Sequence, residues 1–343
     1  MSAATPTSSH FPRWLAAALV ALSAPVVAPR LAVADESANG ATEAHTVATP
    51  AARPEPGSGP GTFPMFVNNS LGLVYGANYR IPFVATPDQP GGADIARTTL
   101  QFSHVDSWRL GHNLAQVMLR VSDSTEPAAG GGAGAVEFYG VFRSGLSINR
   151  LADRSLISLG PLRDIDIQAG ADLQTKNTAY APNERALLLG PRLLFHFYSG
   201  GFVNVGLHLR KEWNRNGILG RNENYDLGFN VEPAWSIPFH VGKAHFTFDG
   251  FADYNTAKGR NAAGHETKPE LLIRPQVKFD LGAALGQTPS VLEVGAGVEY
   301  WHNMFGQDSA LVPGAKQSAV ILSVIYHWGG HRMPETDARN QLR

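Results

Sequence analysis

Apolar and polar residues alternate along most of the chain after residue 65. In the stretch "ELLIRPQVKFDL", residues 270–281, one set of alternate positions is apolar apart from Pro275, and the other set is mostly charged. The same division recurs in residues 163–174, 201–213 and 290–302. A period of two places successive side chains on opposite faces, so these stretches are predicted to be β-strands.

The alternation predicts about twelve strands, each long enough to cross a bilayer at a tilt. They are expected at residues 71–81, 95–105, 113–122, 135–147, 163–174, 184–197, 201–213, 224–236, 244–254, 269–281, 290–302 and 317–328. Connections after odd-numbered strands are mostly long and those after even-numbered strands mostly short, with residues 148–162 as an exception. This is typical of an up-and-down outer-membrane barrel. Three prolines, Pro191, Pro233 and Pro275, fall inside predicted strands, where each removes a ladder hydrogen bond.

The alternation alone fits a soluble sandwich with its apolar face inwards or a membrane barrel with that face outwards. Aromatic residues near strand ends favour the barrel, because they form girdles at the membrane interfaces. They are Trp213, Trp235, Tyr300, Tyr326 and Trp328. Closure of the sheet also removes exposed strand edges, which lipid does not tolerate. We therefore predict an all-β fold, a closed antiparallel transmembrane β-barrel of about twelve strands over residues 65–328.

Residues 1–34 have the order of a secretory signal. Arg13 precedes the apolar run "WLAAALVALSAPVVA", and small residues precede a predicted cleavage site after Ala34. A membrane anchor is the alternative, but prolines interrupt the run and it is shorter than the roughly 20 residues that span a bilayer. Residues 35–64 have the composition of a disordered linker, and residues 329–343 form a polar tail. These features predict export to the bacterial outer membrane.

Composition excludes several kinds of chemistry. The 343 residues include 28 basic and 29 acidic residues and no cysteine, so neither nucleic-acid binding nor a zinc-thiolate site is indicated. The histidines lack the "HExxH" spacing and "GGGAGAVEF" lacks the P-loop lysine, so no metal or cofactor is predicted. Ser323 and His327 lie four residues apart on one strand face, about 13 Å at strand rise. This is too far for direct contact, and no enzymatic activity is predicted.

Three stretches resemble a known family. They are "KEWNRNGILGRNENYDLGFNVEPAWSIPF" (211–239), "VEYWHNMFG" (298–306) and "HVDSWRLGHN" (104–113), the last followed by "VSDSTEPAAGGGAGAVEFYGVFR". From about residue 66 to 328 the chain resembles the nucleoside-specific channel-forming, Tsx-like outer-membrane proteins. The resemblance implies a monomeric barrel that passes nucleosides by facilitated diffusion, in contact with outer-membrane lipid and the barrel-assembly machinery. The linker and the tail after Trp328 depart from the family pattern.

The polar faces supply candidates for a lumen of mixed charge, which suits a neutral polar solute. The candidates for lining it or binding solute are Glu137, Tyr139, Arg143, Arg192, Arg210, Glu212, Arg274, Glu299 and Trp301. Tyr139 and Trp301 can stack on a flat base, and Trp301 is placed near the external mouth. The alternatives are pairing of the charges across strands and a packing or girdle role for the two aromatics. The sequence thus predicts a channel for small polar solutes, most specifically nucleosides. A structural or adhesive barrel, or a lipid-modifying barrel enzyme, is the alternative.

Overall fold

The computed structural model describes residues 66–197 and 200–329. The predicted signal peptide, the predicted linker and all but the first residue of the predicted tail lie outside the described residues. Within the described ranges, no helix is long and apolar enough to cross a membrane.

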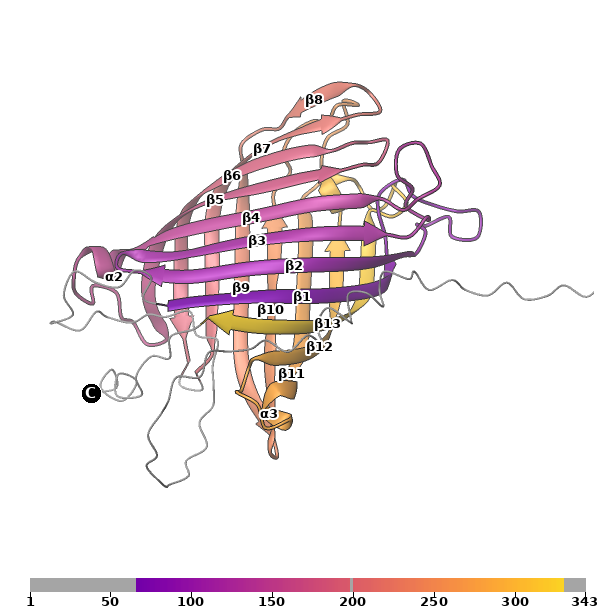
Figure 1. The fold of residues 1–343 in the computed structure, drawn as a ribbon. Helices are drawn as coiled ribbons and strands as arrows, with labels where there is room; N and C mark the ends of the chain where they lie inside the picture. The colour runs from indigo at the N-terminus through magenta and orange to yellow at the C-terminus, as the bar shows by residue number, and fades with distance from the viewer. Residues whose placement is uncertain (1–65, 198–199, 330–343) are drawn as a thin grey trace, which may run out of the picture. The chain divides into compact units, whose positions relative to one another are not determined.

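The described residues form one antiparallel sheet that closes into a barrel (Figure 1). Its strands are β1 (Phe66–Tyr79), β2 (Ile95–Trp108), β3 (Gly111–Ser122), β4 (Val136–Ser147), β5 (Leu162–Lys176), β6 (Asn183–His196), β7 (Phe202–Asn216), β8 (Arg221–Asn224), β9 (Gly228–Val241), β10 (Ala244–Asn255), β11 (Glu270–Asp280), β12 (Leu292–His302) and β13 (Lys316–Gly329). The pairing of β1 with β13 and of β6 with β7 closes the wall. The prediction of a closed antiparallel up-and-down barrel is therefore confirmed.

The short strand β8 is an addition to the twelve predicted strands. Both β8 and β9 pair with β7, β9 along its first half and β8 at its far end, so the two occupy successive parts of one position in the wall. The barrel therefore has twelve strand positions, as predicted. The "RNEN" segment of β8 has no apolar face, and only its pairing with β7 reveals it as a strand.

The connections divide between two ends of the barrel. One end, here called the long-loop end, carries the connections β1–β2, β3–β4, β5–β6, β7–β9, β10–β11 and β12–β13, the last with the short helix η1 (Met304–Gly306). The opposite short-turn end carries two-residue turns such as 242–243. It also carries two longer connections, which hold the helices α2 (Ile148–Leu151) and α3 (Leu281–Ala284). The expected exception at 148–162 is thus the α2 connection.

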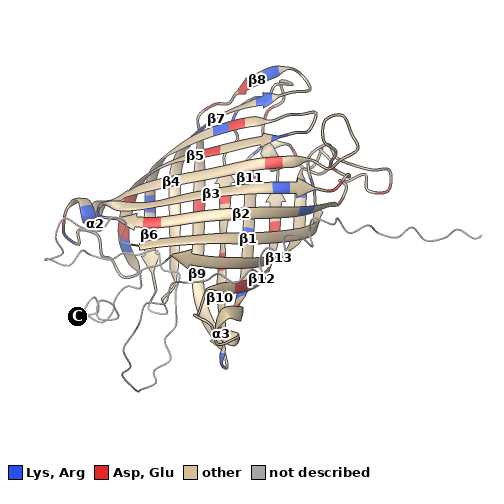
Figure 2. Ribbon diagram, viewed as in Figure 1, with Lys and Arg blue, Asp and Glu red and all other residues tan. Residues whose placement is uncertain are grey.

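The apolar faces of the long strands point outwards. On β1, Leu71, Leu73 and Tyr75 are 39–47% exposed, whereas the intervening Val74 is 4% exposed. On β7, Leu209 is 52% exposed while the neighbouring His208 is fully buried. Charged positions accordingly lie along the strands themselves and not only in the loops (Figure 2). The soluble-sandwich alternative is wrong, because the sheet closes into one barrel and carries its apolar side chains on the outside.

The three prolines coincide with interruptions of the ladder. Between β6 and β7 the pairing skips the two residues that include Pro191, between β9 and β10 it skips Pro233, and between β11 and β12 it skips Pro275. Each proline remains paired on its other side, with β5, β7 or β10. The missing N–H therefore falls where the ladder makes no bond, which explains why these strands tolerate proline.

One sector of the interior is apolar. Val74, Tyr79, Ile95, Ala319 and Ile321 form a buried cluster on β1, β2 and β13. Ile81 and Val84 of the β1–β2 connection pack against it, so this connection is anchored to the inner wall. The polar candidates predicted from the sequence lie on the other strands.

Candidate functional site in the barrel interior

All nine predicted site residues lie on the inward faces of their strands. They are Glu137, Tyr139 and Arg143 on β4, Arg192 on β6, Arg210 and Glu212 on β7, Arg274 on β11, and Glu299 and Trp301 on β12. The structure does not bring them into one cluster. It divides them among a central ion-pair network and smaller groups towards the two ends of the barrel.

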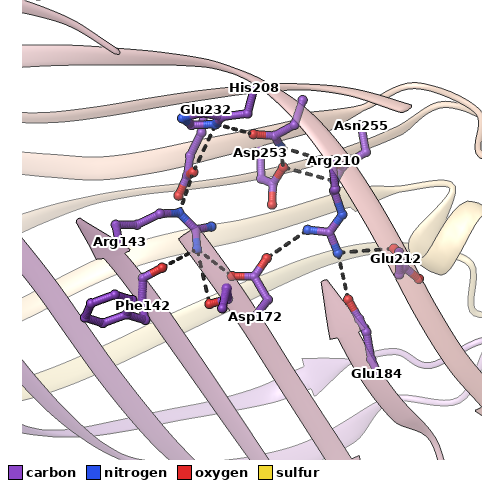
Figure 3. A network of polar contacts seen from close by, with 12 residues as sticks. Phe142, Arg143, Asp172, Glu184, His208, Arg210, Glu212, Glu232, Asp253 and Asn255 are labelled. Carbon is purple, nitrogen blue, oxygen red and sulfur yellow. Dashed lines mark hydrogen bonds and ion pairs between the residues drawn. The ribbon is translucent and has the colours of Figure 1, made fainter. Parts of the chain in front are cut away.

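The largest group, here called the central network, consists of Arg143, Asp172, Glu184, Arg210, Glu212, Glu232 and Lys258. Figure 3 labels all of these residues except Lys258. Arg143 donates from Nη1 to Asp172 Oδ1 at 2.7 Å and from Nε to Glu232 Oε2 at 3.0 Å. Arg210 donates from Nη1 to the other oxygen of Asp172 at 2.8 Å. One buried carboxylate therefore joins the two arginines, each of which is thereby partly neutralised.

The central network continues towards the long-loop end through Arg210. Its Nη2 atom donates to Glu184 at 2.7 Å and to Glu212 at 3.1 Å. Lys258, from the β10–β11 connection, donates to the second oxygen of Glu212 at 2.5 Å. The network thus ties a loop lysine to the five strands β4, β5, β6, β7 and β9, and it contains more carboxylates than basic side chains.

Glu137 belongs to a second group near the long-loop end. It accepts from Arg120 at 2.5 Å and pairs with Lys176 at 2.9 Å. Lys176 also donates to Glu126 of the β3–β4 connection at 2.5 Å. The guanidinium of Arg120 lies over the ring of Tyr139, 4.9 Å from its centroid. One face of Tyr139 is therefore already occupied by a cation.

Arg192 and Arg274 make separate contacts. Arg192 donates from Nη2 to Asp166 at 2.7 Å near the short-turn end, where His112 also lies 2.8 Å from the same carboxylate oxygen. Arg274 lies 3.8 Å from Glu299, which accepts a hydrogen bond from the Gln317 amide at 2.7 Å. The prediction that charges pair across strands is therefore confirmed for these residues.

Trp301 lies at the long-loop end and points inwards. Its indole N–H donates to Glu270 Oε1 at 2.7 Å, and the backbone N–H of Phe305 donates to the same oxygen at 2.8 Å. The rings of Trp301 and Phe305 meet edge to face with centroids 5.1 Å apart. Trp301 is paired with Leu272 in the β11–β12 ladder without a register shift, so it is not a girdle residue displaced by a bulge.

Several residues of these groups were not predicted. Glu232 lies on the inward face of β9, so the alternation could have identified it. Glu126 and Lys258 lie in connections, where no periodicity marks an inward side chain. Glu270 begins β11, and its role as acceptor for Trp301 depends on the β11–β12 register. The sequence signal was thus adequate within strands and absent outside them.

The remaining chemical candidates are located as follows. Ser323 and His327 point to the interior, where Ser323 contacts Gln276 at 3.4 Å and His327 contacts Glu293 at 3.1 Å. The Ser and His side chains of a lipid hydrolase would face the outside of the barrel, whereas these two face the interior. In the described part of the chain, no group of three or more His, Asp and Glu side chains is arranged to hold a metal ion.

No protein-family model and no curated protein matches the chain. Among solved structures, the translocator domain of the autotransporter NalP from Neisseria meningitidis is 12% identical, with a TM-score of 0.39 over 76% of this chain and 88% of that one. The NanC porin is 10% identical, with a TM-score of 0.40 over 75% and 98%. An outer membrane channel from Pseudomonas putida F1 is 8% identical, with a TM-score of 0.46 over 78% and 97%. The similar structures are outer-membrane channels and autotransporter barrels, and at these identities and TM-scores they assign no function to this chain.

Proposed function

We propose that this chain is a channel of the bacterial outer membrane through which small polar solutes diffuse, with nucleosides as the specific candidate. The observation that carries the proposal is the reversed distribution of side chains, with leucines exposed on the outer wall and charges inside. In water, this band of exposed leucines would be an aggregation-prone patch, whereas contact of the same leucines with lipid would stabilise the folded barrel. A closed wall also satisfies the backbone hydrogen bonds that lipid cannot.

The nucleoside assignment is supported by the resemblance of the three sequence stretches and by two inward aromatic rings. Tyr139 and Trp301 present π-faces inside the barrel, and the paired charges around them supply donors and acceptors for ribose hydroxyls and base edges. Stacking on an aromatic ring is worth about 1–3 kcal/mol per base, which suits a transient stop on a diffusion path. As the resemblance implies, we expect a monomer that reaches its membrane through the barrel-assembly machinery.

The test is single-channel recording in planar bilayers with nucleosides added to one side. The wild-type protein should conduct, and adenosine or uridine should interrupt the current while free ribose should not. Trp301→Ala should weaken nucleoside block by about 1–3 kcal/mol if the ring stacks on the base. Trp301→Phe is the matched variant, because it keeps a ring and loses only the hydrogen bond to Glu270.

If nucleosides block the current of Trp301→Phe as strongly as that of the wild type, and block that of Trp301→Ala more weakly, then stacking on the ring is the relevant contact. The opposite result is that nucleosides block the current of all three proteins equally while both variants form a less stable barrel. That result would show that Trp301 stabilises the structure through Glu270 and does not contact solute.

A second candidate function is a structural or adhesive barrel without transport. The specific observation in its favour is the central network, which links β4, β5, β6, β7, β9 and Lys258 through the interior. A barrel that inserts into vesicles, shifts on a gel after heating and conducts nothing would favour this function.

A further inference from the structure

Arg143 and Glu232 join two strands that are not neighbours in the wall. Arg143 is on β4 and Glu232 is on β9, and β5, β6 and β7 lie between these strands in the order of the sheet. Their 3.0 Å contact therefore crosses the interior and does not run along the wall (Figure 3). The other contact that skips a strand within the central network, Arg210 to Asp172, passes over β6 alone.

The arginine of this pair is held rigidly. Besides Asp172, its Nη1 atom donates to the backbone carbonyl of Phe142 at 3.0 Å. Gly170 on the facing strand leaves room for it, since a Cβ atom there would lie 2.7 Å from the Arg143 Cδ. A guanidinium with several fixed acceptors loses little entropy on pairing, so the side chain can extend across the interior.

The side chains of Arg143 and Glu232 differ in how far they are exposed. The Arg143 side chain is 5% exposed, whereas that of Glu232 is 22% exposed. Asp253, on the strand β10 that pairs with β9, accepts hydrogen bonds from the neutral amides of Asn230 and Asn255. A solute that reaches this level therefore meets carboxylates more readily than the guanidinium.

We propose that the Arg143–Glu232 pair is the constriction of the passage and that its exposed carboxylate makes the channel prefer cations over anions. This inference rests on the proposed function, because it supposes that solute moves through the interior. Arg143 sets the width, since its side chain bridges the interior. Glu232 sets the charge preference, because a carboxylate at a narrow point attracts cations and repels anions.

The test compares Arg143→Gln and Glu232→Gln in planar bilayers under a salt gradient. Glu232→Gln changes charge without changing size, so the reversal potential should move towards zero. Arg143→Gln shortens the side chain and should raise the single-channel conductance while retaining the cation preference. The matched control is Arg260→Gln, which removes an ion pair of similar length, 2.6 Å to Glu266, from a loop where both side chains are at least 66% exposed. The control should leave both quantities unchanged.

A second measurement compares the current of one folded preparation before and after cross-linking. The chain contains no cysteine, so the double variant Arg143→Cys, Glu232→Cys carries the only two thiols. A bifunctional methanethiosulfonate reagent should block its current, and dithiothreitol should restore it. Either single cysteine variant should retain more current under the same treatment, because the reagent then has no second thiol to reach across the passage.

The outcomes separate the two proposals. A conducting wild type with unchanged conductance and selectivity in both glutamine variants would place the constriction elsewhere and leave the channel function intact. If the wild type does not conduct and Arg143→Gln does, the result would support the constriction, because the Arg143–Glu232 pair would then close the passage. If none of the proteins that show the heat-modifiable gel shift conducts, the channel function is overturned, and this inference with it.

Discussion

Opposite faces of β2 offer a direct test of which side of the wall meets lipid. Leu100 and Gln101 are adjacent on this strand, so they lie at nearly the same depth. Leu100 is 46% exposed on the outer wall, in a row with Leu73 on β1 and Leu119 on β3, which are 42% and 44% exposed. Gln101 faces inwards and donates to Ser103 at 3.4 Å. Leu100→Arg and Gln101→Arg therefore place the same charge at nearly the same depth, the first on the outer face of the wall and the second on the inner face.

The expected costs differ for a physical reason. An arginine that faces lipid at the middle of an outer-membrane barrel costs about 2–4 kcal/mol. Leu100 is flanked by leucines, so its replacement finds no carboxylate partner on either neighbouring strand. Inside the barrel, Gln101→Arg loses one long hydrogen bond, worth about 1 kcal/mol or less, and the new charge lies among polar groups.

Urea unfolding of the barrel from lipid vesicles measures the difference. With a slope of about 2 kcal/mol per M, Leu100→Arg should lower the midpoint by about 1–2 M, and Gln101→Arg by about 0.5 M or less. The heat-modifiable shift on gels confirms that each variant has folded before unfolding begins. Equal midpoints, or a larger loss for Gln101→Arg, would refute the assignment of the apolar face to lipid.

Two further predictions concern a loop carboxylate and a glycine. Burial opposes ionisation of the Glu126 carboxyl, but Lys176 and Arg97 outweigh it and hold its pKa below the ordinary 4.5. Its stabilising effect should persist above that value and fade as the pH falls through the lowered pKa, and Glu126→Gln should abolish this acid-dependent part of the melting temperature. A Cβ at Gly190 would lie 2.0 Å from a carbonyl oxygen of the facing strand, whereas one at Gly91 would meet nothing within 4 Å. Gly190→Ala should therefore lower the melting temperature and Gly91→Ala should leave it unchanged, and equal melting would contradict the close approach of β6 and β7.

Alternation of apolar and polar residues was sufficient to predict every long strand and to divide its side chains into two faces, but not to say which face points outwards. The strand predicted at 95–105 is β2, which begins at Ile95, and the polar side of the strand predicted at 201–213 is the inward side of β7. Local periodicity carries this information because successive side chains of a strand point to opposite faces whatever the strand pairs with. β1 begins at Phe66, five residues before the predicted start, because its pairing with β2 continues through "FVNNS", where the alternation is weak.

Only the closed wall decided which interior residues meet. Arg143 and Glu232 are 89 residues apart in the chain, and alternation says no more of each than that it faces inwards. Their contact depends on the number of strands between them, on the register of each ladder and on the closure of β6 against β7. The same holds for the hydrogen bond from Trp301 to Glu270. A face is a property of one strand, whereas a contact across a lumen is a property of the whole ring.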